Sequence, residues 1–107
     1  MAKSDNNKTL FKKGEAEMLV KVRYFGKFRS VTEKLEETIN FSGRTVGDLL
    51  DKLCKIYGGK FQKMVIDDNK LASDVIILVN GKSIGDNLRL VLKDGDTVSI
   101  MPFVSGG

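Results

Sequence analysis

The segment from Thr45 to Tyr57 constrains the fold more than any other part of the chain, because it predicts one amphipathic helix. Thr45 is a favourable residue to precede a helix, and Asp48 follows three positions later, where its carboxylate can complete a capping box. Apolar residues then recur at spacings of three and four, which places them on one helix face: Val46, Leu49, Leu50, Leu53 and Tyr57. The helix is expected to end before Gly58 and Gly59. We therefore expect a helix over residues 46–57 with a single face turned towards a core.

Stretches on both sides of this helix predict strands. Before it, residues 18–25 and residues 35–41 alternate between apolar and polar positions, which is typical of a hairpin joined here by a long turn. After it, residues 75–79 are continuously apolar and end in the tight-turn pair Asn80-Gly81. Residues 97–101 form a last strand after a turn at residues 92–96. This order predicts an α+β fold in which a mixed sheet packs against one main helix.

The length of 107 residues fits one domain. Residues 1–17 are polar and without period, so we expect a disordered extension followed by a single domain over residues 18–107. We expect residues 60–74 to be irregular, with a short turn that buries the apolar side chains of Phe61, Met64, Val65 and Ile66. No stretch is long and apolar enough to span a bilayer, and no secretory signal is evident, so we expect a cytoplasmic protein without a membrane partner.

The chain contains no histidine and only one cysteine, Cys54, which excludes several kinds of chemistry. Ser-His-Asp and Cys-His catalysis, imidazole acid–base chemistry and His- or Cys-rich metal sites all need residues that are missing. Cys54 lies beside the apolar stripe of the helix and is expected to be a buried thiol. Asp94 and Asp96 flank a turn glycine and should cap that turn, and residues 67–68 lack the spacing of a calcium loop. We expect no bound cofactor and no metal.

The charge balance is mildly basic, with 18 Lys and Arg against 14 Asp and Glu, for a net charge of +4. The densest basic run comprises Lys21, Arg23, Lys27, Arg29 and Lys34. We interpret this run as a solvated hairpin face. Nucleic-acid binding is less favoured, and a docking surface for an acidic protein partner is an interpretation intermediate between these two.

The end of the chain is the most informative part for function, because no charged side chain follows Asp96. Pro102 cannot donate to a sheet ladder and should mark the exit from the last strand. Fully extended, residues 103–107 would reach ~17 Å beyond the sheet. A slender arm that ends in Gly106 and Gly107 can enter a narrow pocket, where a partner enzyme could reach the terminal carboxylate from several sides. A chance pair of glycines at an ordinary frayed end is the alternative.

Several motifs in their proper order resemble the MoaD/ThiS group of ubiquitin-like sulfur carriers. They are Leu19 to Phe25, the capped helix from Thr45, Ile77-Leu78-Val79-Asn80-Gly81, Leu92-Lys93-Asp94-Gly95-Asp96-Thr97-Val98, and Val104-Ser105-Gly106-Gly107. The likeness covers about residues 18–107 and is greatest to MoaD-type proteins and the small archaeal modifier proteins. The resemblance implies a β-grasp, ubiquitin-like fold.

The resemblance also implies a chemistry. An adenylating enzyme of the MoeB/ThiF type would use ATP to convert the Gly107 carboxylate into an acyl-adenylate, and sulfur transfer would then produce a thiocarboxylate. In the MoaD branch the chain is the small subunit of molybdopterin synthase, and its tail enters the large subunit. In the modifier branch the same terminus is joined to lysines of protein substrates. A third hypothesis is a β-grasp module that binds RNA or protein through the basic run and never reacts at its terminus.

The site residues that the resemblance carries over lie in the last seven positions. Gly107 is the reacting residue, Gly106 belongs to the same motif, and the expected partner-binding surface comprises Met101, Pro102, Phe103, Val104, Ser105 and Gly106. We expect the flexible tail to begin at Phe103. This residue stands where family members often have a second proline, so it could anchor in a partner or pack back onto the sheet. Met101 and Phe103 could together form an exposed apolar patch.

Overall fold

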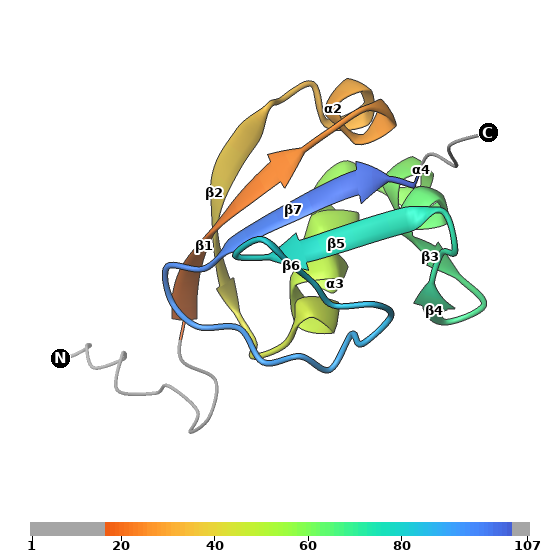
Figure 1. Ribbon diagram of the computed structural model, residues 1–107. Coiled ribbons are helices and arrows are strands. Elements are labelled where there is room, and N and C mark those ends of the chain that lie inside the picture. Colours follow the sequence, from red (N-terminus) through yellow and green to blue (C-terminus); the bar gives the residue numbers. More distant parts are fainter. Residues whose placement is uncertain (1–16, 104–107) are drawn as a thin grey trace, which may run out of the picture.

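The computed structural model describes residues 17–103. Of the extension expected over residues 1–17, residues 1–16 lie outside the described residues, and Glu17 is the first residue of a strand rather than part of a disordered extension. Helices pack against one face of a five-stranded sheet (Figure 1). The elements in chain order are β1 (Glu17–Tyr24), α2 (Lys27–Thr32), β2 (Glu36–Ser42), α3 (Val46–Tyr57), α4 (Gly59–Val65), β3 (Ile66–Asp67), β4 (Lys70–Leu71), β5 (Val75–Val79), β6 (Lys82–Ser83) and β7 (Thr97–Pro102). None of the described helices is long and apolar enough to cross a membrane.

The sheet is mixed, as the sequence predicts. Its strand order is β2-β1-β7-β5-β6, and β1 and β7 run parallel at the centre while the other neighbours are antiparallel. The parallel pair brings together the first and last strands of the described chain, with Val22 opposite Val98 and Tyr24 opposite Ile100. The C-terminal end of β7 therefore lies at the middle of the sheet, between the end of β1 and the start of β5.

Helix α3 has the predicted bounds and cap. The Thr45 hydroxyl accepts a hydrogen bond from the Asp48 backbone at 3.1 Å, and the Asp48 carboxylate accepts one from the Thr45 backbone at 3.0 Å. The helix buries one stripe against the inner face of the sheet: Val46, Leu49, Leu50 and Leu53. Gly58 ends the helix with a positive φ, and its N–H donates to the Cys54 carbonyl at 2.7 Å.

Two expectations for the connecting segments are wrong. The long turn between β1 and β2 contains helix α2, which buries Phe28 and Thr32. Residues 60–74 are not irregular, because they form helix α4 and the small β3–β4 hairpin. Phe28 of α2 packs edge-on against Phe61 of α4, with the ring centroids 6.2 Å apart. Each short helix is thus stabilised by a partner far away in the sequence, which local periodicity does not reveal.

The turns confirm most of the local expectations. Asn80 and Gly81 both have positive φ and connect β5 to β6. The Asp94 carboxylate accepts a hydrogen bond from the Leu19 backbone at 2.8 Å, and the Asp96 carboxylate accepts one from the Lys93 backbone at 2.8 Å. Both carboxylates therefore hold the loop before β7 in place, as expected of turn caps.

Candidate functional site

The predicted site begins at the end of β7, and the structure describes its first three residues. Met101 and Pro102 are the last residues of β7, and Phe103 follows directly. The remaining site residues, Val104, Ser105, Gly106 and Gly107, lie outside the described residues.

Met101 and Phe103 lie on the sheet face that carries no helix. Val98 and Ile100 are completely buried, so alternation turns Met101 to the opposite face, where it pairs with Ile76 of β5. The Phe103 side chain is 54% exposed. This exposure agrees with the predicted apolar patch, and it shows that Phe103 is not buried against its own sheet.

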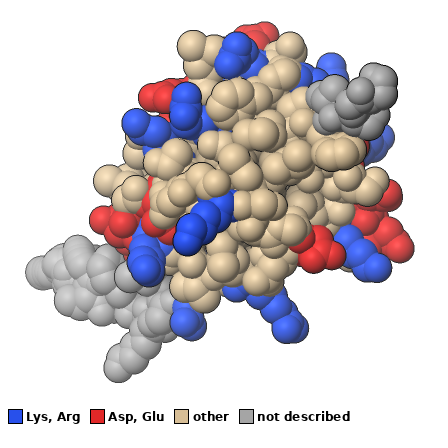
Figure 2. All heavy atoms as spheres, viewed as in Figure 1, with Lys and Arg blue, Asp and Glu red and all other residues tan. Residues whose placement is uncertain are grey.

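The open sheet face is largely uncharged around this patch. Alternating residues of β5 and β7 line it, and their side chains are only partly buried: Ile76, Leu78, Thr97, Ser99 and Met101. Figure 2 shows this face with Lys, Arg, Asp and Glu side chains mainly around its margin. A central uncharged surface that is partly apolar and has a charged rim has the composition of a protein-binding surface.

The basic run does not form one face. Lys21 and Arg23 lie on the open sheet face, where both approach Glu36 of β2, at 3.7 and 3.6 Å. Lys27 pairs with Asp74 at 3.0 Å near the end of β7, and Lys34 contacts Glu37 at 3.3 Å on the side of α3. Because these cations point in several directions and have acidic neighbours, their placement gives the RNA-binding hypothesis no support.

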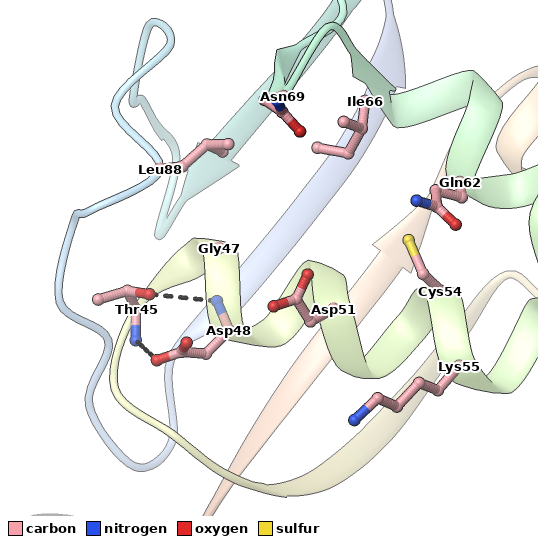
Figure 3. Close-up of a pocket in the computed structure, with 10 residues that line it drawn as sticks. All are labelled: Thr45, Gly47, Asp48, Asp51, Cys54, Lys55, Gln62, Ile66, Asn69 and Leu88. Atoms are coloured by element: carbon pink, nitrogen blue, oxygen red, sulfur yellow. Dashed lines mark hydrogen bonds between the residues drawn. The ribbon is translucent and has the colours of Figure 1, made fainter.

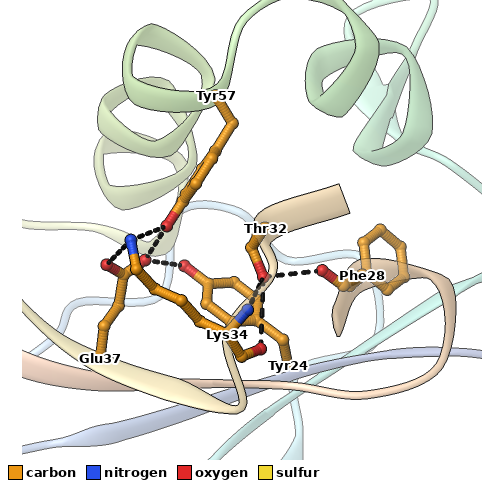
Figure 4. A network of polar contacts seen from close by, with 6 residues as sticks. All are labelled: Tyr24, Phe28, Thr32, Lys34, Glu37 and Tyr57. Atoms are coloured by element: carbon orange, nitrogen blue, oxygen red, sulfur yellow. Dashed lines mark hydrogen bonds and ion pairs between the residues drawn. The ribbon is translucent and has the colours of Figure 1, made fainter. Parts of the chain in front are cut away.

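A polar cluster on the helix side joins β1 and β2 to α3 (Figure 4). The hydroxyls of Tyr24 and Tyr57 both donate to the same carboxylate oxygen of Glu37, and the Lys34 ammonium donates to the Tyr57 hydroxyl at 3.1 Å. Burial alone would raise the pKa of Glu37, but hydrogen bonds from both tyrosines and from Lys34 lower it overall. Burial raises the pKa of Tyr24, and the Glu37 carboxylate raises it further. The cluster thus consists of an ionised glutamate and two neutral tyrosines, and its role is to hold β1 and β2 against α3.

The hollow drawn in Figure 3 is the main alternative to a site at the tail. It measures about 550 Å³ and lies along α3 and α4, with Asp48, Asp51, Cys54 and Gln62 among its lining residues. The Asp48 carboxylate is already occupied by the backbone N–H groups of Arg44 and Thr45, of which the Arg44 bond contributes most to lowering its pKa. Cys54 is only partly buried, whereas a buried thiol was expected, but this burial still raises the pKa of the thiol, so the thiol is not activated. Neither Asp48 nor Cys54 therefore gives this hollow an activated nucleophile.

The acidic pair at residues 67–68 belongs to a turn. Asp68 and Asn69 both have positive φ and connect β3 to β4, as the two central residues of a tight hairpin turn do. Over residues 17–103, no group of three or more His, Cys, Asp or Glu side chains could hold a metal ion.

The comparison with known proteins decides the family. Residues 22–107 match the ThiS family, and this match covers most of the described domain together with the segment that ends in the diglycine. The chain belongs to the ThiS family. Small archaeal modifier protein 3 from Haloferax volcanii is 34% identical over 95 residues, which are 84% of this chain and the whole of that protein.

Solved structures of this family share the fold. The solution structure of small archaeal modifier protein 1 from Methanosarcina acetivorans is 30% identical, covers 86% of this chain and 99% of its own, and has a TM-score of 0.72. A structure from Pyrococcus furiosus, described as a candidate subunit 1 of the molybdopterin converting factor, is 36% identical, covers 81% of this chain and 99% of its own, and has a TM-score of 0.67. The α+β, β-grasp fold and the sulfur-carrier or modifier class expected from the sequence are thereby confirmed.

Residues that the sequence does not single out also meet at the end of β7. The Phe103 backbone N–H donates to the carbonyl of Asp74 at 2.8 Å, so the residue expected to begin a flexible tail is anchored through its backbone. Gly26 contacts Pro102 from the other side. The break that Gly26 makes after the first strand is visible in the sequence, but its neighbour across the sheet is not.

Proposed function

We propose that this ThiS-family chain is a sulfur carrier whose Gly107 carboxylate is activated by a partner enzyme. The observation that carries the proposal is the family match, which extends through Gly107. The part of the open sheet face formed by β5 and β7, whose outward side chains are uncharged, supports it, because such a surface can dock on a partner while the following residues enter that partner's active site.

The chemistry needs only the terminal carboxylate from this chain. One carboxylate oxygen attacks the α-phosphorus of ATP bound to an adenylating enzyme of the MoeB/ThiF type, and pyrophosphate leaves. A sulfide-level sulfur donor, such as hydrosulfide, then attacks the carbonyl carbon of the acyl-adenylate, AMP leaves with the bonding electron pair, and Gly107 carries a thiocarboxylate. The chain is a protein co-substrate in this reaction, and the partner binds the ATP.

We further propose that the carrier acts as the small subunit of a molybdopterin synthase and delivers its sulfur to a pterin precursor held by the large subunit. The similar chain from Pyrococcus furiosus supports this acceptor. A second candidate is a protein modifier joined to substrate lysines through Gly107, and the relative from Haloferax volcanii supports it.

Intact-mass analysis tests the activation step. The protein is incubated with a MoeB/ThiF-type enzyme, ATP and a sulfur donor, and the expected product has one oxygen replaced by sulfur. Deletion of Gly107, or addition of one residue after it, should abolish the exchange while circular dichroism shows an unchanged fold. If both variants were converted as fully as the original protein, the carrier and modifier proposals would both fail.

Docking and acceptor are tested separately. Phe103→Asp should weaken binding to the adenylating enzyme, whereas Ile56→Asp, at a residue 46% exposed on α3, should not. Equal affinity of the two variants would exclude the open sheet face as the docking surface. Tagged protein in cell lysates should form bands that persist in reducing SDS only if it modifies lysines, so their absence favours the carrier.

A further inference from the structure

Two turns that are far apart in the sequence meet at the end of β7. One connects β1 to α2 and contains Gly26, which is followed by Lys27, the first residue of α2; the other precedes β5 and contains Asp74. Because β7 lies between β1 and β5 in the sheet, these turns flank Pro102 on its two sides. We call Gly26, Lys27 and Asp74 the collar.

Gly26 fits against Pro102 in a way that no other residue could. A Cβ atom added at Gly26 would lie 2.8 Å from Cγ of Pro102, a distance that real Cβ atoms essentially never show, and 3.1 Å from Cδ, which is tighter than most real contacts. Its φ of 56° and ψ of −131° are also rarely adopted by residues with a side chain. Any substitution here must therefore displace either the turn or the proline that begins the exit from the sheet.

Asp74 anchors Phe103, the residue that follows Pro102. Pro102 has no N–H to donate, and the next residue, Phe103, donates its backbone N–H to the Asp74 carbonyl at 2.8 Å. The Asp74 carboxylate in turn accepts a hydrogen bond from the Lys27 ammonium at 3.0 Å. The Lys27–Asp74 pair thus links the two turns beside the end of the strand.

This ion pair has little value for the stability of the domain. The side chains are 44% and 58% exposed, and ion pairs at such exposed positions contribute little. Its position suggests another role, because it fixes the backbone segment whose carbonyl anchors Phe103. Four residues follow Phe103 in the sequence, and a chain of four residues can span at most ~13–14 Å.

Resting on the proposed function, we propose that Gly26, Lys27 and Asp74 are positioning residues. They fix the start and the direction of the C-terminal arm, so that docking on the sheet face also aims Gly107 at the active site of the adenylating enzyme. An arm with a fixed start loses less conformational freedom on insertion than one that is free from Met101 onwards. The collar should therefore lower the KM for this protein as substrate and leave kcat almost unchanged.

The test measures adenylation kinetics with the full-length protein as the varied substrate. Gly26→Ala should raise KM roughly five- to thirty-fold, the factor that corresponds to ordering one further backbone residue. Lys27→Met and Asp74→Asn should each raise KM by a smaller factor of about two to five, as expected for loss of one exposed ion pair. Lys27→Arg keeps the positive charge and should have the KM of the original protein. Lys82→Met, which changes an exposed lysine in β6, is the matched control.

A second readout does not depend on the partner. Exchange of the Phe103 amide hydrogen, followed by NMR, should be faster in Lys27→Met and Asp74→Asn than in the original protein, while amides of α3 exchange as before. This measurement also covers the case in which Gly26→Ala does not fold.

The possible outcomes separate the two proposals. If the original protein is not adenylated at all, the proposed function is refuted, and the positioning role with it. If the original protein is adenylated but KM and Phe103 exchange are the same in the collar variants as in Lys82→Met, the collar alone is refuted. A fall in kcat without a change in KM would also contradict it.

Discussion

Replacing Glu37 with leucine should destabilise the domain through a residue that contacts no predicted partner surface. The Glu37 carboxylate is the acceptor for the hydroxyl of Tyr24, whose side chain is completely buried. Without that carboxylate, the hydroxyl loses its acceptor in a place from which water is excluded. An unsatisfied buried donor costs about 1–3 kcal/mol in the free energy of unfolding.

The converse substitution behaves differently. Tyr24→Phe removes the donor, and Glu37 keeps the Tyr57 hydroxyl and the Lys34 ammonium as partners. A hydrogen bond to a charged group contributes about 1.5–3 kcal/mol, so this variant should also be destabilised. In the double variant no unsatisfied hydroxyl is left at residue 24, and its loss of stability should be about 1–3 kcal/mol smaller than the sum of the two single losses.

Urea unfolding followed by far-UV circular dichroism measures the cycle, since the chain has no tryptophan to report by fluorescence. Glu36→Leu is the control, because Glu36 is the preceding residue of β2 but faces the open side of the sheet, where its side chain is 48% exposed. We expect this control to change stability by less than about 1 kcal/mol. Single losses that add to within about 0.5 kcal/mol would show that Tyr24 and Glu37 are not coupled, and the reasoning would be wrong.

Three further predictions concern stability. Because the pKa of Glu37 is lowered in the folded protein, its contribution to the free energy of unfolding is present above the usual pKa of 4.5 and is lost as the pH falls through the lower folded value. Stability measured against falling pH should therefore decrease less steeply for Glu37→Leu than for the original protein. Identical curves for the two proteins would contradict this. Thr45→Ala removes the acceptor for the Asp48 N–H and should cost about 0.5–2 kcal/mol by urea unfolding, whereas Thr38→Ala on the exposed face of β2 should cost less. Leu53→Ala leaves a cavity at a completely buried position and should cost about 2–5 kcal/mol, seen as a lower Tm, and a loss below 1 kcal/mol would mean that the core refills.

Local patterns predicted the parts of the fold whose stabilising contacts are close in the sequence. Helix α3 and strand β5 have the predicted bounds, since a cap, a periodic stripe and a turn pair act over a few residues. Helices α2 and α4 were not predicted, because each is a short helix without a side-chain cap, stabilised by packing of Phe28 against Phe61. The same distinction applies to the site, where the uncharged end of the chain is evident but the contacts of Gly26 and Asp74 with it are not.

The sequence by itself determined the main helix, the principal strands and an uncharged end with two glycines, because each depends on the chemistry of neighbouring residues. It also excluded histidine-based catalysis. Only the tertiary structure decided that β1 and β7 lie parallel at the centre of the sheet, and that the turns before α2 and β5 therefore flank Pro102. Pairing of strands so far apart depends on how the whole apolar surface is buried, and no short stretch of sequence contains that information.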